Sequence, residues 1–189
     1  MRTTRFVDFL ECMPMQEAYR PLLDSATLEP RSERLHAKLE GGPMNYELYM
    51  AEAIAEARRG TQEGEEAVGA VCVIDDAMVA RDHQRSAATG DPTAHAVLLT
   101  LQASARKLGR RRLAEATIFS TREPCAMCVG ALLEARVRAL VYAVPDPDRG
   151  AAGSAVQLAR NPALGHQLSV VSGVRESEAR RLQTESASV

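Results

Sequence analysis

The stretch Thr121-Arg122-Glu123-Pro124-Cys125-Ala126-Met127-Cys128 places two thiols three residues apart, directly after a proline. Residues three apart share one face of a helix, so both sulfurs can reach the same ion. Proline suits the first helical position, because its missing N–H would be unpaired there in any case. The positive end of the helix dipole favours thiolate over thiol. This stretch therefore predicts a metal site in the first turn of a helix.

The other half of this site is expected upstream, in Pro92-Thr93-Ala94-His95-Ala96-Val97. His95 stands at the start of a second predicted helix. Three protein ligands leave the fourth position of Zn²⁺ to water, which is the pattern of a catalytic rather than a structural zinc. We expect His95, Cys125 and Cys128 to bind one Zn²⁺ per chain. The alternative is a core histidine beside a redox dithiol, and the upstream His motif and the proline disfavour it.

Position 97 departs from the pattern of a working site. Zinc nucleobase deaminases carry the signature H-x-E…P-C-x-x-C, in which the Glu is the general acid/base. This chain has His95, Pro124, Cys125 and Cys128 in that pattern, but Val97 stands where the Glu belongs. A valine has no proton to move. The plainer interpretation, that Val97 only packs on the inner face of its helix, leads to the same expectation: proton transfer from this position is absent.

The composition is typical of a soluble domain with an ordinary core. The chain has 189 residues, of which 46% are hydrophobic and 25% charged. A net charge of −2 gives no global electrostatic reason to expect nucleic-acid or membrane binding. Four cysteines without a recognisable signal peptide or a run of transmembrane length suggest a reducing, cytoplasmic location.

Two regions are expected. Residues 1–43 contain prolines at positions 14, 21, 30 and 43 and end in the linker-like 40–43, which predicts an N-terminal extension that is partly helical or disordered. It is either an arm that docks a partner, a poorly ordered extension, or a helix that lies on the parent domain. Residues 44–189 are expected to form the zinc-binding domain.

The second region alternates predicted helices and strands. Helices are expected from Asn45 to Gly60, with Leu48, Ala51 and Ile54 on the apolar face, and over 95–108, 125–136 and 175–183. Strands are expected over 67–74, 77–80, 116–121, 139–144 and 168–171, and residues 84–92 are expected to form a polar loop. Alternation after an initial hairpin predicts an α/β fold, with a mixed sheet covered by helices on both faces.

Residues 44–185 resemble the bacterial tRNA adenosine deaminases of the cytidine-deaminase superfamily. The matching stretches are Val68–Val71, Asp91–Ala96, Glu123–Ala131 and Gly150–Ser154. The resemblance implies a three-layer α/β/α cytidine-deaminase fold with a mixed five-stranded sheet, hydrolytic deamination of adenine or a related amidine base, and a dimer. It also implies substrate contacts from five positions, which are Gln84, Ala96, Pro124, Asp146 and Ser154.

Three departures from the family pattern affect these expectations. Val97 replaces the Glu, Gln84 stands where the family usually has an Asn that contacts the base, and Ala67 replaces a customary Pro. In its valine the chain is similar to the non-catalytic subunit of the eukaryotic tRNA adenosine deaminase. The resemblance implies that the chain forms either a homodimer or a heterodimer with a related deaminase subunit. It also implies that the chain binds tRNA or a nucleoside, and that it binds no membrane.

Three hypotheses of function therefore stand. The chain is a deaminase-family protein that is weak or silent alone and serves as a structural or RNA-binding subunit. Alternatively, it is an active zinc hydrolase on a small nucleoside or other amidine, using Glu123 or His83 as a different acid/base. The third hypothesis is a binding module that docks a partner through residues 1–43. The basic run Arg106–Arg112 is either a phosphate-contacting patch or a solvated loop after a helix.

Overall fold

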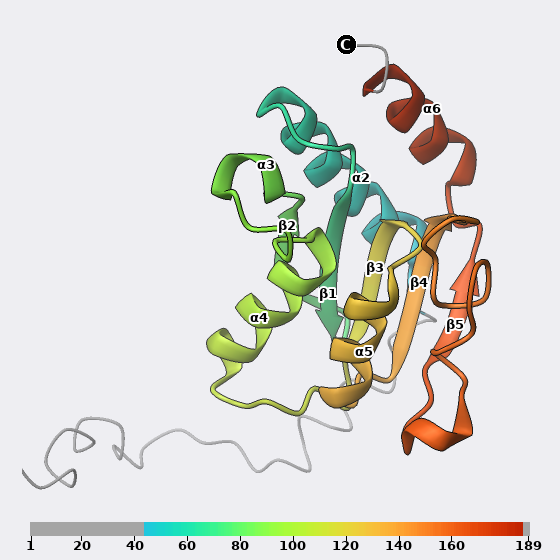
Figure 1. Cartoon of the computed structure of the whole chain (residues 1–189). Helices are drawn as coiled ribbons and strands as arrows, with labels where there is room; N and C mark the ends of the chain where they lie inside the picture. Colours follow the sequence, from blue (N-terminus) through green and yellow to red (C-terminus); the bar gives the residue numbers. More distant parts are fainter. Residues whose placement is uncertain (1–43, 187–189) are drawn as a thin grey trace, which may run out of the picture. The chain divides into compact units, whose positions relative to one another are not determined.

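The computed structural model describes residues 44–186, and the predictions for residues 1–43 lie outside that range. Figure 1 shows the arrangement of the elements. The elements in chain order are α2 (Tyr46–Gln62), β1 (Gly69–Ile74), β2 (Ala77–His83), α3 (Ser86–Thr89), α4 (Ala96–Leu108), β3 (Thr117–Arg122), α5 (Ala126–Glu134), β4 (Ala139–Val144), the 3₁₀ turn η2 (Pro162–Leu164), β5 (Ser169–Ser172) and α6 (Glu176–Ser186).

One five-stranded mixed sheet forms the centre of the domain, as predicted. The strand order is β2-β1-β3-β4-β5. β1 pairs antiparallel with both β2 and β3, whereas β3, β4 and β5 run parallel to one another. Parallel neighbours need a crossover connection. Helix α5, which follows the end of β3 at Arg122, supplies that connection between β3 and β4 and therefore lies over the sheet.

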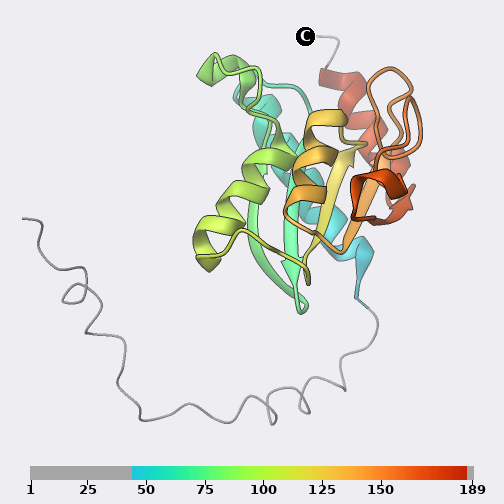
Figure 2. The ribbon, with the colours of Figure 1, turned by 60° about the horizontal axis from the view of Figure 1, so that its bottom comes forward.

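Helices cover both faces of the sheet, which confirms the three-layer α/β/α expectation. Helices α2 and α6 lie on one face and pack on side chains such as Val71, Phe119 and Val141. Helices α4 and α5 lie on the other face, over Cys72, Ile118 and Leu140. Figures 1 and 2 show the two pairs on opposite sides of the strands. Within residues 44–186, no helix is both long and apolar enough to cross a membrane.

The expected apolar face of α2 was correct at Ile54, which is buried, and wrong at Leu48. Leu48 is 52% exposed, whereas Tyr49, Met50 and Ala57 are buried. Alanines at 51, 53, 55 and 57 make both faces look apolar in sequence. The position of the sheet, rather than the periodicity, decides which of them is buried. The predicted end of this helix at Gly60 was also wrong, because α2 continues to Gln62. Glycine tolerates many backbone conformations, the helical one included, so it does not by itself end a helix.

The segment between the hairpin and α4 also differs from its prediction. Strand β2 extends to His83, three residues beyond the predicted end. The segment expected to be a polar loop contains the short helix α3, which ends at Gly90 in the left-handed conformation (φ 64°). Two backbone N–H groups at the start of α3, those of Ala87 and Ala88, donate to the buried carboxylate of Glu65. Glu65 lies more than 20 residues before α3 in the chain, so its stabilisation of this four-residue helix leaves no local signal in the sequence.

Candidate metal centre and base pocket

His95, Cys125 and Cys128 come together at the N-terminal ends of α4 and α5. The Nδ1 atom of His95 lies 3.5 Å from Sγ of Cys125 and 3.6 Å from Sγ of Cys128. All three potential ligand atoms lie within 4.8 Å of one another. Tetrahedral zinc, with Zn–S near 2.3 Å and Zn–N near 2.0–2.1 Å, requires nitrogen–sulfur separations of about 3.5 Å. The three side chains are therefore spaced to bind one Zn²⁺, as the sequence predicted.

Both helices begin at a metal-binding residue, and this corrects the expected position of the proline. His95 and Cys125 have extended backbones and are the N-cap residues of α4 and α5. Their carbonyls accept the first helical hydrogen bonds, from Leu99 and Val129 respectively, each at 2.9 Å. Pro124 consequently lies one residue before the cap rather than at the first helical position. Two helix N-termini point toward the site, and their dipoles stabilise anionic ligands there.

The two thiols differ in charge when no metal is bound. A hydrogen bond from Cys128 lowers the pKa of Cys125 to about 5, with smaller help from the nearby His95. The same hydrogen bond, together with burial, raises the pKa of Cys128. The metal-free pair therefore holds one proton, which is on Cys128 and hydrogen-bonds to the Cys125 thiolate. Zinc needs both sulfurs as thiolates, so binding must release the proton that Cys128 holds.

A pocket opens beside the three metal-binding residues. Val97, Gln84, Pro124 and Asp146 line it together with the metal site. Val97 is only 3% exposed and belongs to the core cluster under α4 and α5. Val97 is thus both a wall of the pocket and a packed core residue.

Two of the five predicted substrate contacts lie elsewhere. Ala96 is fully buried in the core cluster and does not line the pocket. Ser154 is exposed, and its hydroxyl donates to Glu123 rather than pointing into the pocket. Gln84 does line the pocket and is 7% exposed, with its Nε2 donating a 3.0 Å hydrogen bond to Oγ of Ser86. Its contact with a substrate stays a prediction.

Glu123 lines the pocket but is fully engaged by the loop that follows β4. Its Oε1 accepts hydrogen bonds from the backbone N–H groups of Ala152 (2.9 Å) and Ser154 (3.1 Å). Its Oε2 accepts from the N–H of Asp146 at 3.1 Å and from the Ser154 hydroxyl. Four donors give this carboxylate a fixed position in the loop.

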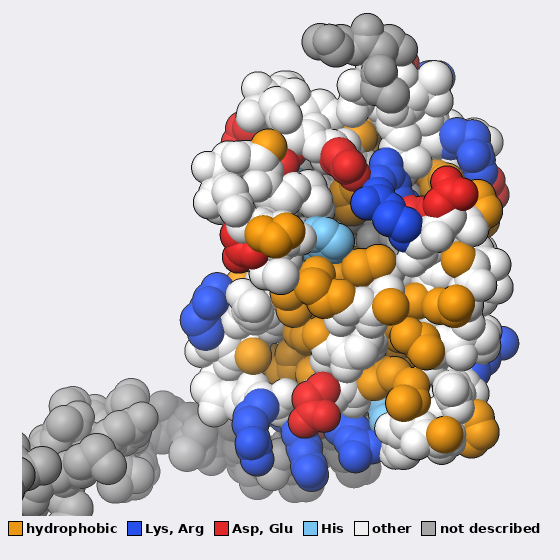
Figure 3. All heavy atoms as spheres, in the orientation of Figure 1, with side chains coloured by type: hydrophobic (Ala, Val, Ile, Leu, Met, Phe, Trp, Pro, Cys, Tyr) orange, Lys and Arg blue, Asp and Glu red, His pale blue; other side chains and the backbone are white. Residues whose placement is uncertain are grey.

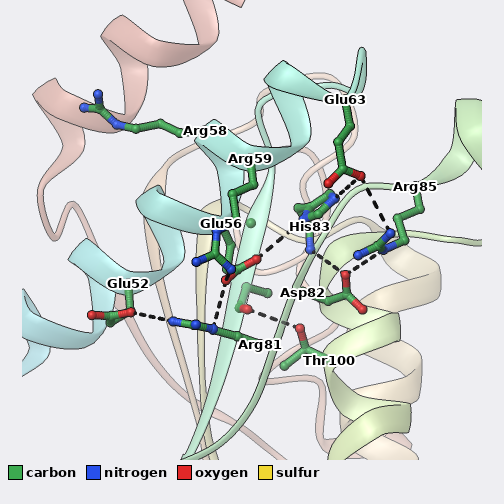
Figure 4. Close-up of polar contacts among 12 residues, drawn as sticks. Glu52, Glu56, Arg58, Arg59, Glu63, Arg81, Asp82, His83, Arg85 and Thr100 are labelled. Carbon is green, nitrogen blue, oxygen red and sulfur yellow. Dashed lines mark hydrogen bonds and ion pairs between the residues drawn. The ribbon is translucent and has the colours of Figure 1, made fainter.

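His83 faces away from the metal centre. Figure 4 shows its ring among side chains from α2 and from the end of that helix. Its Nδ1 lies 3.5 Å from the buried carboxylate of Glu56, and its Nε2 lies 3.1 Å from Glu63. His83 does not line the pocket. Of the two residues predicted as a different acid/base, Glu123 lines the pocket and His83 does not.

The sequence did not reveal the charged rim of the pocket. Glu66, Arg122 and Arg149 all line it. Arg122 directly precedes Glu123 in the metal-binding stretch, so its proximity was readable from the motif. Glu66 lies just before β1 and 56 positions before Arg122, so the pairing of these two residues depends on the order of strands in the sheet.

The basic run Arg106–Arg112 lies at the far end of α4 from His95. An α-helix rises 1.5 Å per residue, so the 13 residues of α4 separate the two ends by about 20 Å. Arg106 and Lys107 occupy the last turn, where positive charge suits the dipole. Lys107 donates to the carbonyl of Val79, and Arg110 pairs with Glu115. This run is therefore not part of the pocket.

Comparison with known proteins agrees with this geometry. Residues 43–144 match the family model of the cytidine and deoxycytidylate deaminase zinc-binding region. The chain is 41% identical over 132 residues to the tRNA-specific adenosine deaminase of Bacillus subtilis, an alignment that covers 70% of this chain and 82% of the relative. It is 38% identical over 130 residues to the tRNA-specific adenosine deaminase of Agrobacterium fabrum, covering 69% and 86% of the two chains.

Solved structures show the same likeness. One, from a study of A-to-I editing by tRNA:A34 deaminases at the wobble position of transfer RNA, has a TM-score of 0.69 and 37% identity, covering 71% of this chain and 97% of that one. A guanine deaminase from Nitrosomonas europaea superposes with a TM-score of 0.67 over 86% of this chain and 95% of its own. At 22% identity, that second likeness concerns the fold alone.

Proposed function

The chain belongs to the cytidine and deoxycytidylate deaminase family and, within it, to the tRNA-specific adenosine deaminases, and from this premise we propose that it is a zinc-binding member that is weak or silent as a deaminase on its own. The observation that carries the proposal is Val97. It lines the pocket beside His95, Cys125 and Cys128, at the place of the family's proton-transferring Glu.

The reaction of the family shows why one residue matters so much. Hydrolytic deamination adds water to an amidine carbon, protonates a ring nitrogen and then protonates the departing amine. Zinc, when bound, supplies an activated water whose pKa falls toward ~7. A positioned acid/base contributes roughly 10²–10⁴ in rate. A valine side chain supplies none of this, while the metal-binding residues and the pocket that would bind a base remain.

The other acids that line the pocket support the same proposal. Glu123 is saturated by four hydrogen-bond donors. Asp146 accepts hydrogen bonds from the backbone N–H groups of Asp148 (3.1 Å) and Arg149 (3.0 Å) through one oxygen, and its other oxygen faces the guanidinium of Arg149. Both carboxylates are held in place by these contacts, so neither is free to move between the atoms of a substrate and a water, and a different proton shuttle is not favoured among them.

The decisive experiment compares the chain with its Val97→Glu and Val97→Gln variants. Each protein is loaded with zinc, which is then quantified, and inosine formation is measured on a wobble-adenosine tRNA stem-loop and on free nucleosides. We expect activity to rise by roughly 10²–10⁴ in Val97→Glu. Val97→Gln is the matched control, because it adds the same bulk and polarity without an ionisable group.

The outcomes of this comparison are distinct. Inosine formation confined to Val97→Glu would support a complete base site that lacks one group. Robust conversion by the unchanged chain would refute the proposal. If no variant converts either substrate, the pocket has been remodelled for another base. Gln84, which narrows what the pocket can hydrogen-bond, would then be the residue to change first, and the active hydrolase on another amidine would become the preferred function.

A second part of the proposal is that the chain works beside another deaminase subunit. Figure 3 shows hydrophobic side chains gathered over the face formed by α4 and α5. Met127 is 37% exposed on α5, and Val156 and Leu164 are 50% and 47% exposed. Apolar patches of this kind mark protein interfaces. We expect light scattering to show a dimer, alone or with an active family member, and Val156→Glu with Leu164→Glu to dissociate it.

A further inference from the structure

Three charged side chains from separate segments meet at the mouth of the base pocket. Glu66 lies just before β1, Arg122 is the last residue of β3, and Arg149 lies in the loop after β4. Oε2 of Glu66 lies 2.8 Å from Nη1 of Arg122 and 3.8 Å from Nη2 of Arg149. One carboxylate oxygen therefore lies in reach of two guanidinium groups. Figure 3 shows acidic and basic side chains gathered near a histidine at this hollow.

These ion pairs are easily exchanged. The side chains of Glu66 and Arg149 are 53% and 61% exposed, and pairs this exposed contribute little to stability. Arg122 is the more buried cation, because its side chain is 23% exposed. A bound anion would therefore contact one partly buried guanidinium and one exposed guanidinium.

The chemistry of this pair of arginines suits a phosphate. Guanidinium is planar, always charged, and binds phosphate oxygens with two parallel N–H donors. The position held by Oε2 of Glu66 is where a phosphate oxygen would receive donors from both arginines. Glu66 carries a single negative charge and offers only one oxygen to the two groups, so a phosphate fits the position better. Asp146, 4.0 Å from Nε of Arg149, limits the excess positive charge.

We propose that Arg122 and Arg149 bind a phosphate adjacent to the base that enters the pocket, and that Glu66 occupies this phosphate position in the free chain. The inference rests on the proposed function in that a base must occupy the zinc pocket. It narrows the ligand class from free bases and nucleosides to nucleotides, either as 5′-monophosphates or within a polynucleotide. Glu66 competes with the phosphate for the two arginines. A nucleoside has no phosphate and therefore does not displace it.

The test measures the affinities of adenosine, adenosine 5′-monophosphate and a short single-stranded RNA for the zinc-loaded chain by calorimetry. We expect the monophosphate to bind roughly tenfold more tightly than adenosine. Arg122→Gln with Arg149→Gln should abolish that preference, and Glu66→Gln should increase it several-fold. Arg58→Gln is the control, because Arg58 is 56% exposed and pairs with Glu178 away from the pocket.

Each outcome decides the inference. If adenosine binds and the double arginine variant keeps the full preference for the phosphate, the inference is overturned while the proposed function stands. If neither small molecule binds, the RNA decides the inference alone: unchanged RNA affinity in the double arginine and Glu66→Gln variants rejects it. If the RNA does not bind either, the proposed function and the inference fail together. Monophosphate binding without RNA binding identifies free nucleotides as the ligands, and the reverse identifies a polynucleotide.

Discussion

The backbone N–H of Ala152 donates a 2.9 Å hydrogen bond to Oε1 of Glu123, two residues before the metal-binding Cys125. Glu123 is 3% exposed and accepts three further hydrogen bonds from the same loop. The carboxylate therefore connects the loop after β4, which carries Asp146 and Arg149, to the segment that carries the thiols. Metal centre and pocket rim are parts of one hydrogen-bonded unit.

Replacing Glu123 should loosen that unit. Glu123→Gln keeps the size of the side chain but turns one acceptor oxygen into an NH₂ group, which then faces N–H or O–H donors of the loop. A buried donor left without an acceptor costs about 1–3 kcal/mol. We expect urea unfolding at neutral pH to show a loss of this size. Glu134→Gln, at an exposed position on α5, is the control and should leave the midpoint unchanged. An unchanged midpoint in Glu123→Gln would show that the loop does not depend on the carboxylate.

Gly150 should tolerate no side chain. A Cβ atom at this position would lie 2.4 Å from the carbonyl oxygen of Asp146 and 2.5 Å from the carboxylate of Glu123. Because both neighbours are fixed by hydrogen bonds, Gly150→Ala should destabilise the domain and lower its zinc content. Gly130→Ala is the matched control on α5. No atom lies within 4 Å of a Cβ there, and alanine is preferred in a helix by about 1 kcal/mol.

The two substitutions should therefore shift thermal unfolding in opposite directions. Equal shifts would mean that the loop moves aside at Gly150 without cost. Zinc content, measured by atomic absorption after gel filtration, separates an effect on the loop from an effect on the metal centre.

How much of this the sequence could predict depends on how local each feature is. The metal-binding residues were predictable, because the spacing of Cys125 and Cys128 is fixed by one helical turn and the proline marks where that turn begins. The sheet was predictable because β1, β3 and β4 are nearly continuous apolar runs. The Cys-x-x-Cys turn and each single strand reside in short stretches of consecutive residues.

Features that depend on distant partners could not be predicted. The helical repeat in α2 allows more than one apolar face, and only contact with Phe119 selects Tyr49 over Leu48. The pairing of Glu66 with Arg122 requires β1 and β3 to be neighbours, which no local pattern states. The same holds for the hydrogen bond that the Ser154 hydroxyl donates to Glu123.

Zinc binding should release about one proton near neutral pH. The pKa of Cys125 is lowered to about 5, so this thiol is already ionised, whereas the raised pKa of Cys128 keeps its thiol protonated in the metal-free chain. Zinc affinity should therefore increase by about tenfold per pH unit as pH rises above 7. Competition with a chromophoric chelator over that range measures the slope. A slope near zero or two would contradict this charge distribution.

The control for this prediction is Cys72→Ala. Cys72 is fully buried on β1, and burial raises the pKa of its thiol, so it should neither bind the metal nor affect the slope. His95→Ala, in contrast, should weaken zinc binding strongly while leaving the pH dependence due to Cys128.

Glu56 should contribute to stability but not to the metal centre. Its carboxylate is 3% exposed and contacts Arg59 at 2.9 Å, Arg81 at 3.0 Å and His83 at 3.5 Å. Glu56→Ala removes these contacts and leaves a buried ring nitrogen of His83 without its partner. We expect a loss of about 1–3 kcal/mol in urea unfolding.

Glu52→Ala is a close control, because Glu52 lies one helical turn earlier on α2 and pairs with the same arginine at 2.9 Å (Figure 4). Its side chain is 37% exposed, so its removal should cost no more than about 1 kcal/mol. Zinc stoichiometry should be unchanged in both variants, since His83 turns toward α2 and away from the pocket. Loss of zinc in Glu56→Ala alone would instead connect His83 and its neighbour Gln84 to the metal centre, and would reopen His83 as a candidate for proton transfer.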